Sequence, residues 1–182
     1  MKYDVIKYWN EREDPNNPSN PLHDHSTYVY KNLEECKSIL DFGPGVGRMF
    51  PAFADCDDVI GYDISFKYVE RIHYEASLYP FEFTLMIENE ISELPFKDGQ
   101  FDAVVCVSVL LHQTKDKIES IMSELCRVGK KVIVISFYNP KKEIKEGDTY
   151  FHYDYPEICE RNGWNIIEME IRNRQIYFVY SR

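Results

Sequence analysis

The sequence predicts a single α/β domain with a doubly wound, mostly parallel sheet of seven strands. Short apolar runs alternate along the chain with amphipathic stretches of helical period, which is typical of strands joined by crossover helices. A length of 182 residues suits one domain. The last two strand-like runs, residues 165–171 and 175–180, flank a few polar residues, so they predict a hairpin that adds one antiparallel strand.

The N-terminal elements are two helices followed by two strands. Residues 3–13 are expected to form the first helix, which ends at three prolines between residues 15 and 21 because proline cannot continue a helix. A second helix over about residues 24–35 leads into a strand over residues 38–42. Residues 58–62 form the second strand.

The middle of the chain continues this alternation. Ser65 is the expected N-cap of the next helix. Its apolar face comprises Phe66, Val69, Ile72 and Ala76. Residues 81–87 alternate between apolar and polar side chains and predict the third strand. Residues 101–109 are almost wholly apolar, as expected of a central strand that is covered on both faces.

The C-terminal half contributes two helices and the fifth strand. The first helix should end at Gly129 as its C-terminal cap, and residues 131–137 form the fifth strand. The apolar stripe of this helix comprises Ile118, Ile121, Met122, Leu125 and Val128. Asp154 and Pro156 open the last helix, and Asn162-Gly163 ends it.

The charge balance narrows the class of partner. Twenty-one Lys and Arg against thirty-one Asp and Glu give a net charge of −10. Because a phosphate backbone is recognised by basic surfaces, this excess argues against a self-sufficient nucleic-acid-binding protein. It leaves room for a local basic patch at Lys141, Lys142 and Lys145.

Cysteine usage and hydropathy indicate a cytoplasmic protein. The five cysteines are odd in number and include no C-x-x-C pair, which favours buried free thiols in a reducing compartment over disulfides or a zinc site. The longest uncharged apolar run, residues 103–111, is about half of what a membrane span needs. Nothing at the N-terminus has the pattern of a secretory signal.

The most specific feature is a glycine-rich turn between the first strand and the next helical segment. It reads Asp41-Phe42-Gly43-Pro44-Gly45-Val46-Gly47-Arg48. Glycines permit positive φ and let a ligand approach the backbone. Asp63 follows at the end of the second strand, where an acidic residue binds the ribose hydroxyls of an adenosine ligand. Together these features predict an adenosine-containing cofactor at the switch point of the sheet.

The spacing of the turn excludes two classes of nucleotide site. The third glycine comes one residue early for a dinucleotide-binding motif, which would place it where Arg48 stands. No Gly-Lys-Ser/Thr follows, so the turn is not a nucleotide-triphosphatase loop. The pattern Asp-x-Gly-x-Gly-x-Gly instead resembles the first motif of class I S-adenosylmethionine-dependent methyltransferases. The segment from Leu94 to Asp102 is similar to the one that leads into the fourth strand in small members of type 11.

This resemblance covers about residues 36–137 and implies a Rossmann-like fold that uses S-adenosyl-L-methionine and releases S-adenosyl-L-homocysteine. It divides the single domain, residues 1–182, into an N-terminal helical lid (1–35), a cofactor-binding core (36–137) and a C-terminal helix and hairpin (138–182). The charged segment 140–149 is the best candidate for a linker.

The resemblance also implies which residues bind the cofactor. They are Tyr8, Trp9, Asp41, Gly43, Gly45, Gly47, Asp63, Ile64, Glu90, Ile91, Val107 and Ser108. Asp41 would organise the turn and receive the cofactor's amino group, or simply cap the following amides. Glu90 and Ile91 stand where the family places an Asp and a small residue against the adenine, and Glu88 or Asn89 is an alternative. Tyr8 and Trp9 resemble a cofactor lid but equally suit a hydrophobic staple.

His112, directly after the fourth strand, is the candidate general base. Methyl transfer from a sulfonium mainly needs alignment of the reactants and exclusion of water, and a base helps when the acceptor must lose a proton. A structural role for His112 stays open, and His23, His25 and His152 are weaker candidates. The histidines show no metal-ligand spacing.

The acceptor is expected to be a small molecule with an oxygen or nitrogen nucleophile. Phe137, Tyr138 and the aromatic run of residues 150–155 suit an apolar wall over a planar acceptor, or else a loop packed on the sheet edge. Asn139-Pro140 lacks the second proline of the signature of amino-methylating DNA enzymes and follows the wrong strand. Two other functions remain: a methyltransferase-like subunit that binds a cofactor or partner without catalysis, and a nicotinamide oxidoreductase, which Arg48 and the terminal hairpin disfavour.

Overall fold

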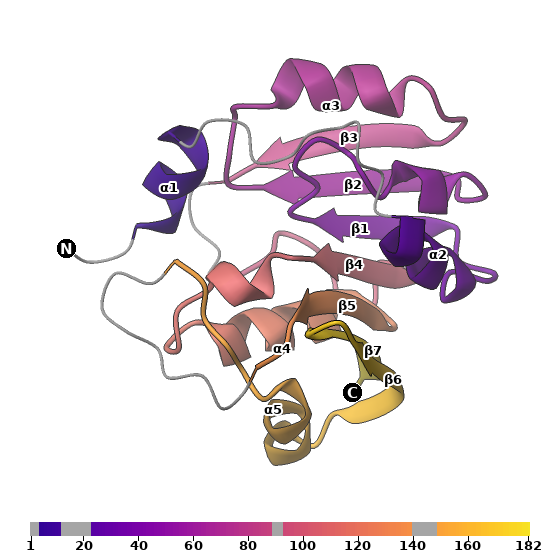
Figure 1. Cartoon of the computed structure of the whole chain (residues 1–182). Coiled ribbons are helices and arrows are strands. Elements are labelled where there is room, and N and C mark those ends of the chain that lie inside the picture. Colours follow the sequence, from indigo (N-terminus) through magenta and orange to yellow (C-terminus); the bar gives the residue numbers. More distant parts are fainter. Residues whose placement is uncertain (1–3, 12–22, 89–92, 140–148) are drawn as a thin grey trace.

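Seven strands form one sheet in the order β3-β2-β1-β4-β5-β7-β6 (Figure 1). The computed structural model describes residues 4–11, 23–88, 93–139 and 149–182. The strands are β1 (Ser38–Phe42), β2 (Asp58–Asp63), β3 (Glu82–Ile87), β4 (Ala103–Val107), β5 (Val132–Phe137), β6 (Asn165–Arg172) and β7 (Gln175–Ser181). Neighbours from β3 to β5 pair in parallel, whereas β7 is antiparallel to both β5 and β6. The predicted fold class and the terminal hairpin are confirmed.

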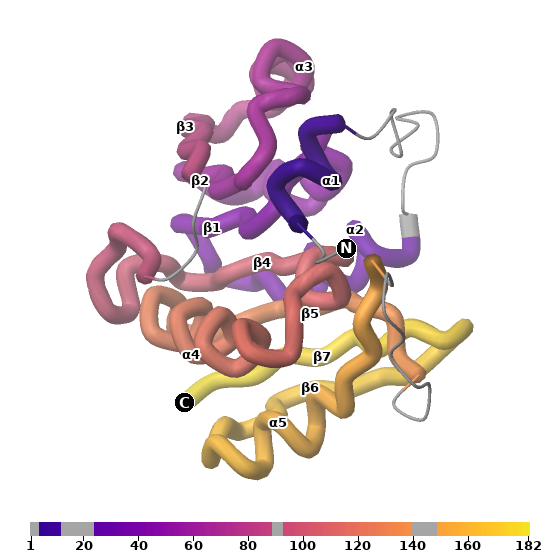
Figure 2. Tube along the Cα trace, turned by 90° about the vertical axis from the view of Figure 1, so that its left-hand side faces the viewer, coloured from indigo at the N-terminus to yellow at the C-terminus, as the bar shows by residue number. Residues whose placement is uncertain are grey.

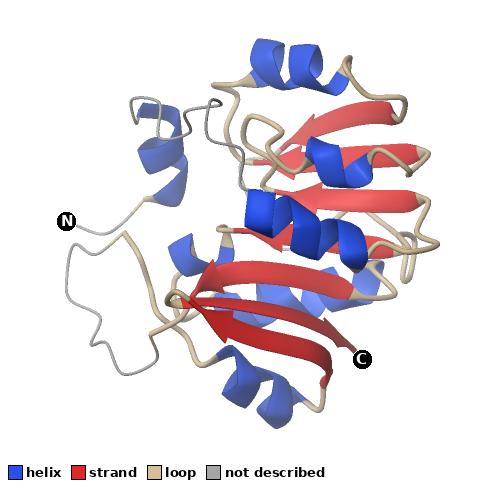
Figure 3. Ribbon diagram, turned by 45° about the vertical axis from the view of Figure 1, so that its right-hand side comes forward, coloured by secondary structure: helices blue, strands red, loops and turns tan. Residues whose placement is uncertain are grey.

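Helices cover both faces of this sheet (Figure 3). They are α1 (Val5–Glu11), α2 (His23–Lys31), α3 (Val69–Ala76), α4 (Ile118–Val128) and α5 (Tyr155–Asn162), with short 3-10 turns η1 (Phe50–Phe53) and η2 (Leu110–His112). Successive strand residues alternate between two cores. Leu40 packs with residues of α4 and α5, whereas Ile39 packs with residues of α2, η1 and α3. The parallel strands are therefore buried on both sides, as their continuous apolar runs predict.

The predicted caps of α4 and α5 are present, each for its own reason. Asp154 caps α5 by accepting a hydrogen bond from the Glu157 amide at 3.2 Å, and Gly163 ends that helix at φ +69°. Gly129 ends α4 with an extended rather than left-handed backbone. A glycine is needed there because a Cβ would lie 2.6 Å from Cγ2 of Val104. All five residues of the predicted α4 stripe are buried.

The start of α3 was predicted wrongly. The helix begins at Val69, and its N-cap position is Tyr68 rather than Ser65. Ser65 instead belongs to the turn after β2, because its amide donates to Asp63 Oδ1 and its hydroxyl donates to Asn10 Oδ1. Phe66, expected on the buried face of this helix, is 66% exposed.

Several other boundaries are shorter than predicted. The helix over residues 24–35 ends at Lys31, and the central strand stops at Val107 instead of residue 109. Ser108 has φ +59°, and this left-handed residue turns the chain out of the strand direction. The linker prediction falls almost wholly on residues outside the described part of the chain.

Two further predictions concern composition. All five cysteines are free and buried, as expected. Among the described residues, no helix combines the length and apolarity that crossing a membrane requires, and no group of three or more His, Cys, Asp or Glu side chains is arranged to hold a metal ion. Helix α1 lies at the edge of the sheet toward which β1 and β2 run, apart from the packed layers (Figures 1 and 2).

Candidate functional site

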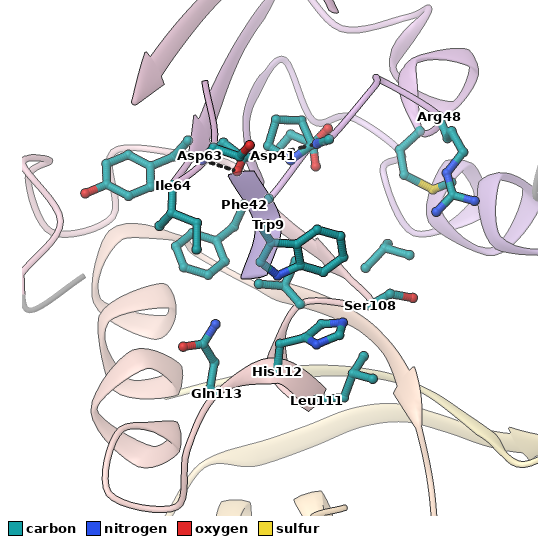
Figure 4. Close-up of a pocket in the computed structure, with 18 of the residues that line it drawn as sticks. Trp9, Asp41, Phe42, Arg48, Asp63, Ile64, Ser108, Leu111, His112 and Gln113 are labelled. Carbon is teal, nitrogen blue, oxygen red and sulfur yellow. Dashed lines mark hydrogen bonds between the residues drawn. The ribbon is translucent and has the colours of Figure 1, made fainter. Parts of the chain in front are cut away.

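A cavity of about 270 Å³ opens at the edge where β1, β2 and β4 end (Figure 4). The described residues that line it are Trp9, Asp41, Phe42, Gly43, Pro44, Gly45, Arg48, Met49, Tyr62, Asp63, Ile64, Ser65, Tyr68, Val107, Ser108, Val109, Leu111, His112, Gln113, Phe137 and Tyr150. Ligands of open α/β sheets bind at this edge, at the point where strand order reverses. Here β1 lies between β2 and β4, so the cavity occupies that switch point.

The glycine turn forms one wall of the cavity through its backbone. Gly43 has φ +77°, and a Cβ there would lie 2.3 Å from Cγ2 of Val109. Its amide donates to Tyr62 O at 2.8 Å, which ties the turn to the end of β2. Gly43 and Gly45 line the cavity as predicted, so a ligand meets backbone there instead of side chains.

Gly47 does not line the cavity, contrary to its predicted role in cofactor binding. Its φ is +80°, and a Cβ there would lie 2.4 Å from Cε2 of Phe50. The third glycine of the motif therefore lets the turn pack against the core ring of Phe50.

Asp63 organises the turn from the neighbouring strand. Its Oδ2 accepts from the Gly45 amide at 3.1 Å, and its Oδ1 accepts from the Ser65 amide at 3.0 Å. Burial raises the pKa of Asp63, and backbone hydrogen bonds from Ser65, Gly45 and Ile64 oppose that rise. Each carboxylate oxygen has two acceptor sites, so a side chain held in this way can still accept from ligand hydroxyls.

Asp41 is 2% exposed, and none of the described residues donates a hydrogen bond to its Oδ2. The alternative that it merely caps the turn is wrong for the described chain, because the Gly45 amide donates to Asp63 instead. Burial, together with the nearby Asp63 carboxylate, raises the pKa of Asp41 to about 8. Two carboxylates thus lie close together at the cavity, an arrangement that favours a cationic ligand group.

His112 lies at the opposite side of the cavity from the turn and is 3% exposed. Its Nδ1 donates to Thr149 O at 2.9 Å, since a carbonyl only accepts. Rings from two distant segments surround it: Trp9 at 4.8 Å, Tyr150 at 4.9 Å and Tyr8 at 5.8 Å between centroids. Trp9 lines the cavity itself, whereas Tyr8 does not line it and packs on two lining residues, Trp9 at 5.3 Å and His112.

The end of β4 and some of the predicted aromatic residues line the cavity. Val107 and Ser108 line the cavity, and the Ser108 amide donates to Ile135 O at 2.8 Å, which holds the left-handed turn on β5. Phe137 and Tyr150 also line it and remain 41% and 36% exposed. Tyr138 does not line the cavity.

The remaining predicted residues lie elsewhere or outside the described chain. Glu90, Ile91 and Asn89 are not among the described residues, so their predicted contact with adenine stays a prediction. Glu88 is exposed and away from the cavity lining. His25 is buried on α2, where its Nε2 bonds Gln175 Oε1 at 2.9 Å, and neither His25 nor His152 lines the cavity. The side chain of His23 is not described.

Several lining residues were missed by the analysis of the sequence. The motifs indicate neither Arg48 nor Gln113 as a lining residue, although both line the cavity. Ile64 was predicted to line the site, but Tyr62 and Tyr68 on either side of it were not. The sequence does hold one signal for Gln113. It is a polar residue in the segment that follows a central strand, and that segment faces the edge of the sheet where ligands bind.

The family model described as "Methyltransferase domain" matches residues 40–134, just over half of the chain. The chain belongs to this family. The matched part of this methyltransferase domain runs from β1 to β5 and includes the glycine turn, Asp63 and His112.

Curated relatives of the methyltransferase domain are distant and longer. It is 26% identical over 162 residues to the chloroplastic magnesium protoporphyrin IX methyltransferase of Arabidopsis thaliana, with 78% of this chain and 50% of that protein covered. It is 28% identical over 120 residues to sterol 24-C-methyltransferase of Candida albicans, with 64% of this chain and 31% of that protein covered. The chain thus spans 31% to 50% of the length of these relatives.

Solved structures show the same fold over nearly the whole chain. Magnesium protoporphyrin IX methyltransferase from Synechocystis PCC 6803 with bound SAH superposes with a TM-score of 0.73 at 21% identity, covering 98% of each chain. A methyltransferase from Clostridium acetobutylicum, described as S-adenosylmethionine-dependent, gives a TM-score of 0.71 at 11% identity, covering 87% of this chain and 91% of that chain.

Proposed function

We propose that this methyltransferase domain transfers a methyl group from S-adenosyl-L-methionine to an oxygen or nitrogen nucleophile of a small-molecule acceptor. The observation that carries the proposal is the pair of carboxylates, Asp41 and Asp63, beside a glycine turn in one cavity. Family membership and the Synechocystis neighbour with bound SAH support it.

The residues present fit this cofactor. Asp41 has a buried oxygen that none of the described residues bonds, and it would receive the cofactor's ammonium group. Gly43 and Gly45 would cradle the methionine part, because a side chain at Gly43 would strike Val109. Asp63 would accept from the ribose hydroxyls. Arg48 is the only Lys or Arg among the described lining residues, and it would pair with the cofactor's carboxylate.

Bound S-adenosylmethionine would supply a methyl group on a positively charged sulfur. The lone pair of the acceptor bonds to the methyl carbon, and the sulfur departs as a neutral thioether. The protein's part is to align the acceptor and to exclude water. Trp9 does both from α1: it lines the cavity and packs edge-on against His112.

His112 would remove the proton of a hydroxyl acceptor. Because its Nδ1 donates to Thr149 O, Nε2 is the nitrogen that accepts a proton in the neutral ring. The ring is 3% exposed in the ligand-free chain and lines the cavity, so its basic nitrogen works in a site from which most water is excluded.

The acceptor would be apolar and broad rather than a nucleic acid. Phe137, Tyr150, Leu111 and Val109 offer an apolar wall beside His112. The two curated relatives are named for a sterol and for magnesium protoporphyrin, both of which have large apolar frames. A net charge of −10 disfavours a polyanionic acceptor.

Calorimetric titration with S-adenosylhomocysteine and NAD tests the cofactor assignment. The protein should bind S-adenosylhomocysteine and not NAD, and Asp63→Ala should weaken that binding by about 1–3 kcal/mol. Asp63→Asn is the matched variant, since its amide oxygen can still accept from the Gly45 amide that Asp63 holds at 3.1 Å. Tight binding of NAD alone would reject the proposal.

A methyl-transfer screen against fractionated cell extract tests turnover. Methyl groups should pass to a small apolar product, and His112→Gln should slow transfer to a hydroxyl acceptor. Binding of S-adenosylhomocysteine without turnover on any fraction would instead support the catalytically silent subunit.

A further inference from the structure

One buried polar group of the cavity has no part in the chemistry proposed above. Gln113 lines the cavity and is only 4% exposed. Among the described residues, none forms a hydrogen bond with its carboxamide. The main chain of Gln113, by contrast, is fixed at both groups: its amide donates to Leu110 O at 3.1 Å, and its carbonyl accepts from the Tyr153 hydroxyl.

These contacts separate two possible roles of the residue. The loop after β4 is held through the backbone of Gln113, so any side chain of similar size would serve it equally well. The carboxamide borders the cavity and has no hydrogen-bond partner among the described residues. Its two N–H donors and its carbonyl acceptor are then available to a bound molecule that presents an acceptor next to a donor.

The position of Gln113 indicates which part of a ligand it meets. In Figure 4 its carboxamide points into the cavity on the side of Ile64, while His112 lies beside it below Trp9. Ile64 directly follows Asp63, the residue proposed to hold the ribose. The base is bonded to that ribose, so it must lie near Ile64, which is 9% exposed and offers an apolar surface.

We propose that Gln113 recognises the adenine of the cofactor: its carbonyl accepts from the 6-amino group, and its N–H donates to the neighbouring ring nitrogen. A carboxamide matches this pair of groups because adenine presents a donor beside an acceptor at that edge. The inference rests on the proposed function, since it takes the ribose to be held by Asp63. It adds a base-recognition residue on the loop after β4.

A cycle of protein and ligand changes tests this contact. Calorimetry measures the binding of S-adenosylhomocysteine and of its 6-deamino analogue, in which purine replaces adenine, to the wild type and to Gln113→Met. The wild type should bind S-adenosylhomocysteine about tenfold more tightly than the analogue. In Gln113→Met this ratio should fall to near one, whereas Gln100→Met, at an exposed glutamine before β4, should keep it.

Unfolding of the ligand-free variants gives an independent readout. Gln113→Met should unfold at the same temperature as the wild type or higher, because the substitution breaks no side-chain hydrogen bond among the described residues. A lower unfolding temperature, or an unchanged ratio in Gln113→Met, would overturn the adenine contact. Failure of the wild type to bind S-adenosylhomocysteine at all would instead overturn the proposed function itself.

Discussion

Asp41 and Asp63 illustrate how two identical side chains on neighbouring strands acquire different roles. Their strands pair in parallel, with Asp41 opposite Gly61 and Asp63 two residues further along β2. Asp63 therefore reaches the amides of the turn, whereas Asp41 stays beneath it with an unbonded oxygen. Asp63 thus holds the turn within the chain, whereas the oxygen of Asp41 is the one proposed to bind the cofactor's ammonium group.

The raised pKa of Asp41, about 8, makes a prediction about stability. An unfolded aspartate titrates near pH 4, so between about pH 4 and 8 the folded chain binds more protons than the unfolded chain. The free energy of unfolding should therefore fall as the pH rises through this window. Asp41→Asn removes the effect, and its stability relative to the wild type should grow by up to about 1.4 kcal/mol per pH unit.

Urea unfolding at pH 5, 6, 7 and 8 measures this difference. A gap between the two proteins that stays constant with pH would show that Asp41 is ionised throughout. Saturating S-adenosylhomocysteine should reduce the dependence, because its ammonium group favours the charged carboxylate.

Gly43 and Gly99 form a matched pair for separating backbone strain from steric conflict. Both have positive φ, but a Cβ at Gly43 would lie 2.3 Å from Val109 Cγ2, and nothing lies within 4 Å of one at Gly99. We expect Gly99→Ala to cost about 1 kcal/mol of stability for its conformation alone. Gly43→Ala should cost about 1–3 kcal/mol more, since Val109 must move.

Equilibrium unfolding of the two variants checks this, and Gly43→Ala/Val109→Ala should recover part of the steric cost. Equal destabilisation by the two glycine substitutions would contradict the tight approach of Val109 to the turn.

At the scale of elements, Asp102 anchors the beginnings of β1 and β4. Its Oδ2 accepts from the amides of Lys37 and Ser38 at 2.9 and 3.0 Å, and its Oδ1 accepts from Lys130 Nζ at 2.7 Å. Lys130 and these amides lower the pKa of Asp102. The stability that this carboxylate contributes should be present above about pH 4 and be lost as the pH falls below that value.

Asp102→Ala should reduce the free energy of unfolding by about 1–3 kcal/mol at pH 7, since the amides of Lys37 and Ser38 at the start of β1 lose their acceptor. Asp98→Ala is the control, because the Asp98 side chain is 80% exposed and its ion pair with Arg127 lies at the surface. We expect a change below about 1 kcal/mol there. If the two variants unfold at the same urea concentration, the anchoring role of Asp102 is wrong.

At the scale of the molecule, α1 contributes a residue to the cavity but buries none of its own residues in the core. None of its residues is buried, yet Trp9 lines the cavity and Asn10 accepts from the Ser65 hydroxyl at 3.1 Å. Deleting residues 1–11 should change the free energy of unfolding by less than about 1 kcal/mol. The same deletion should weaken binding of S-adenosylhomocysteine about tenfold, because it removes Trp9 from the lining of the cavity proposed to hold this ligand.

Trp9→Ala should reproduce the loss of affinity, whereas Lys7→Ala, whose side chain is 64% exposed, should not. Calorimetry and urea unfolding on the same preparations separate the two effects. A deletion that unfolds the protein would show that α1 belongs to the core structure.

The fold was predictable because the pattern that marks each strand lies within a short stretch of the sequence. The apolar run that contains β4, the glycine turn after β1 and Asp63 at the end of β2 were each placed correctly in the fold, because these signals depend on neighbours along the chain. Ser65 was misread because its partners, Asp63 and Asn10, come from the turn and from a helix 55 residues earlier.

The site was predictable where short stretches of sequence build it, at the glycine turn, at the ends of β2 and β4, and at Trp9. Gly43, Gly45 and Asp63 were found, but Gln113 and Arg48 reach the cavity because of how the loop after β4 and the end of the turn fold back. Gly47 belongs to the same motif as the two lining glycines, yet it packs against the ring of Phe50 instead of lining the cavity. Which of these residues line the cavity depends on contacts between distant segments, and the pattern of apolar residues along the chain does not reveal such contacts.

Because all five thiols are buried, the native cysteines should not react with a thiol-specific label in the folded protein. A maleimide dye added to the folded protein should find no accessible sulfur, since the most exposed of the five cysteines, Cys36, shows 7% of its surface. One cysteine introduced at Lys67, in the segment between the lining residues Ser65 and Tyr68, would then carry a single fluorophore. The chain thereby becomes a reporter whose emission follows ligand entry in real time.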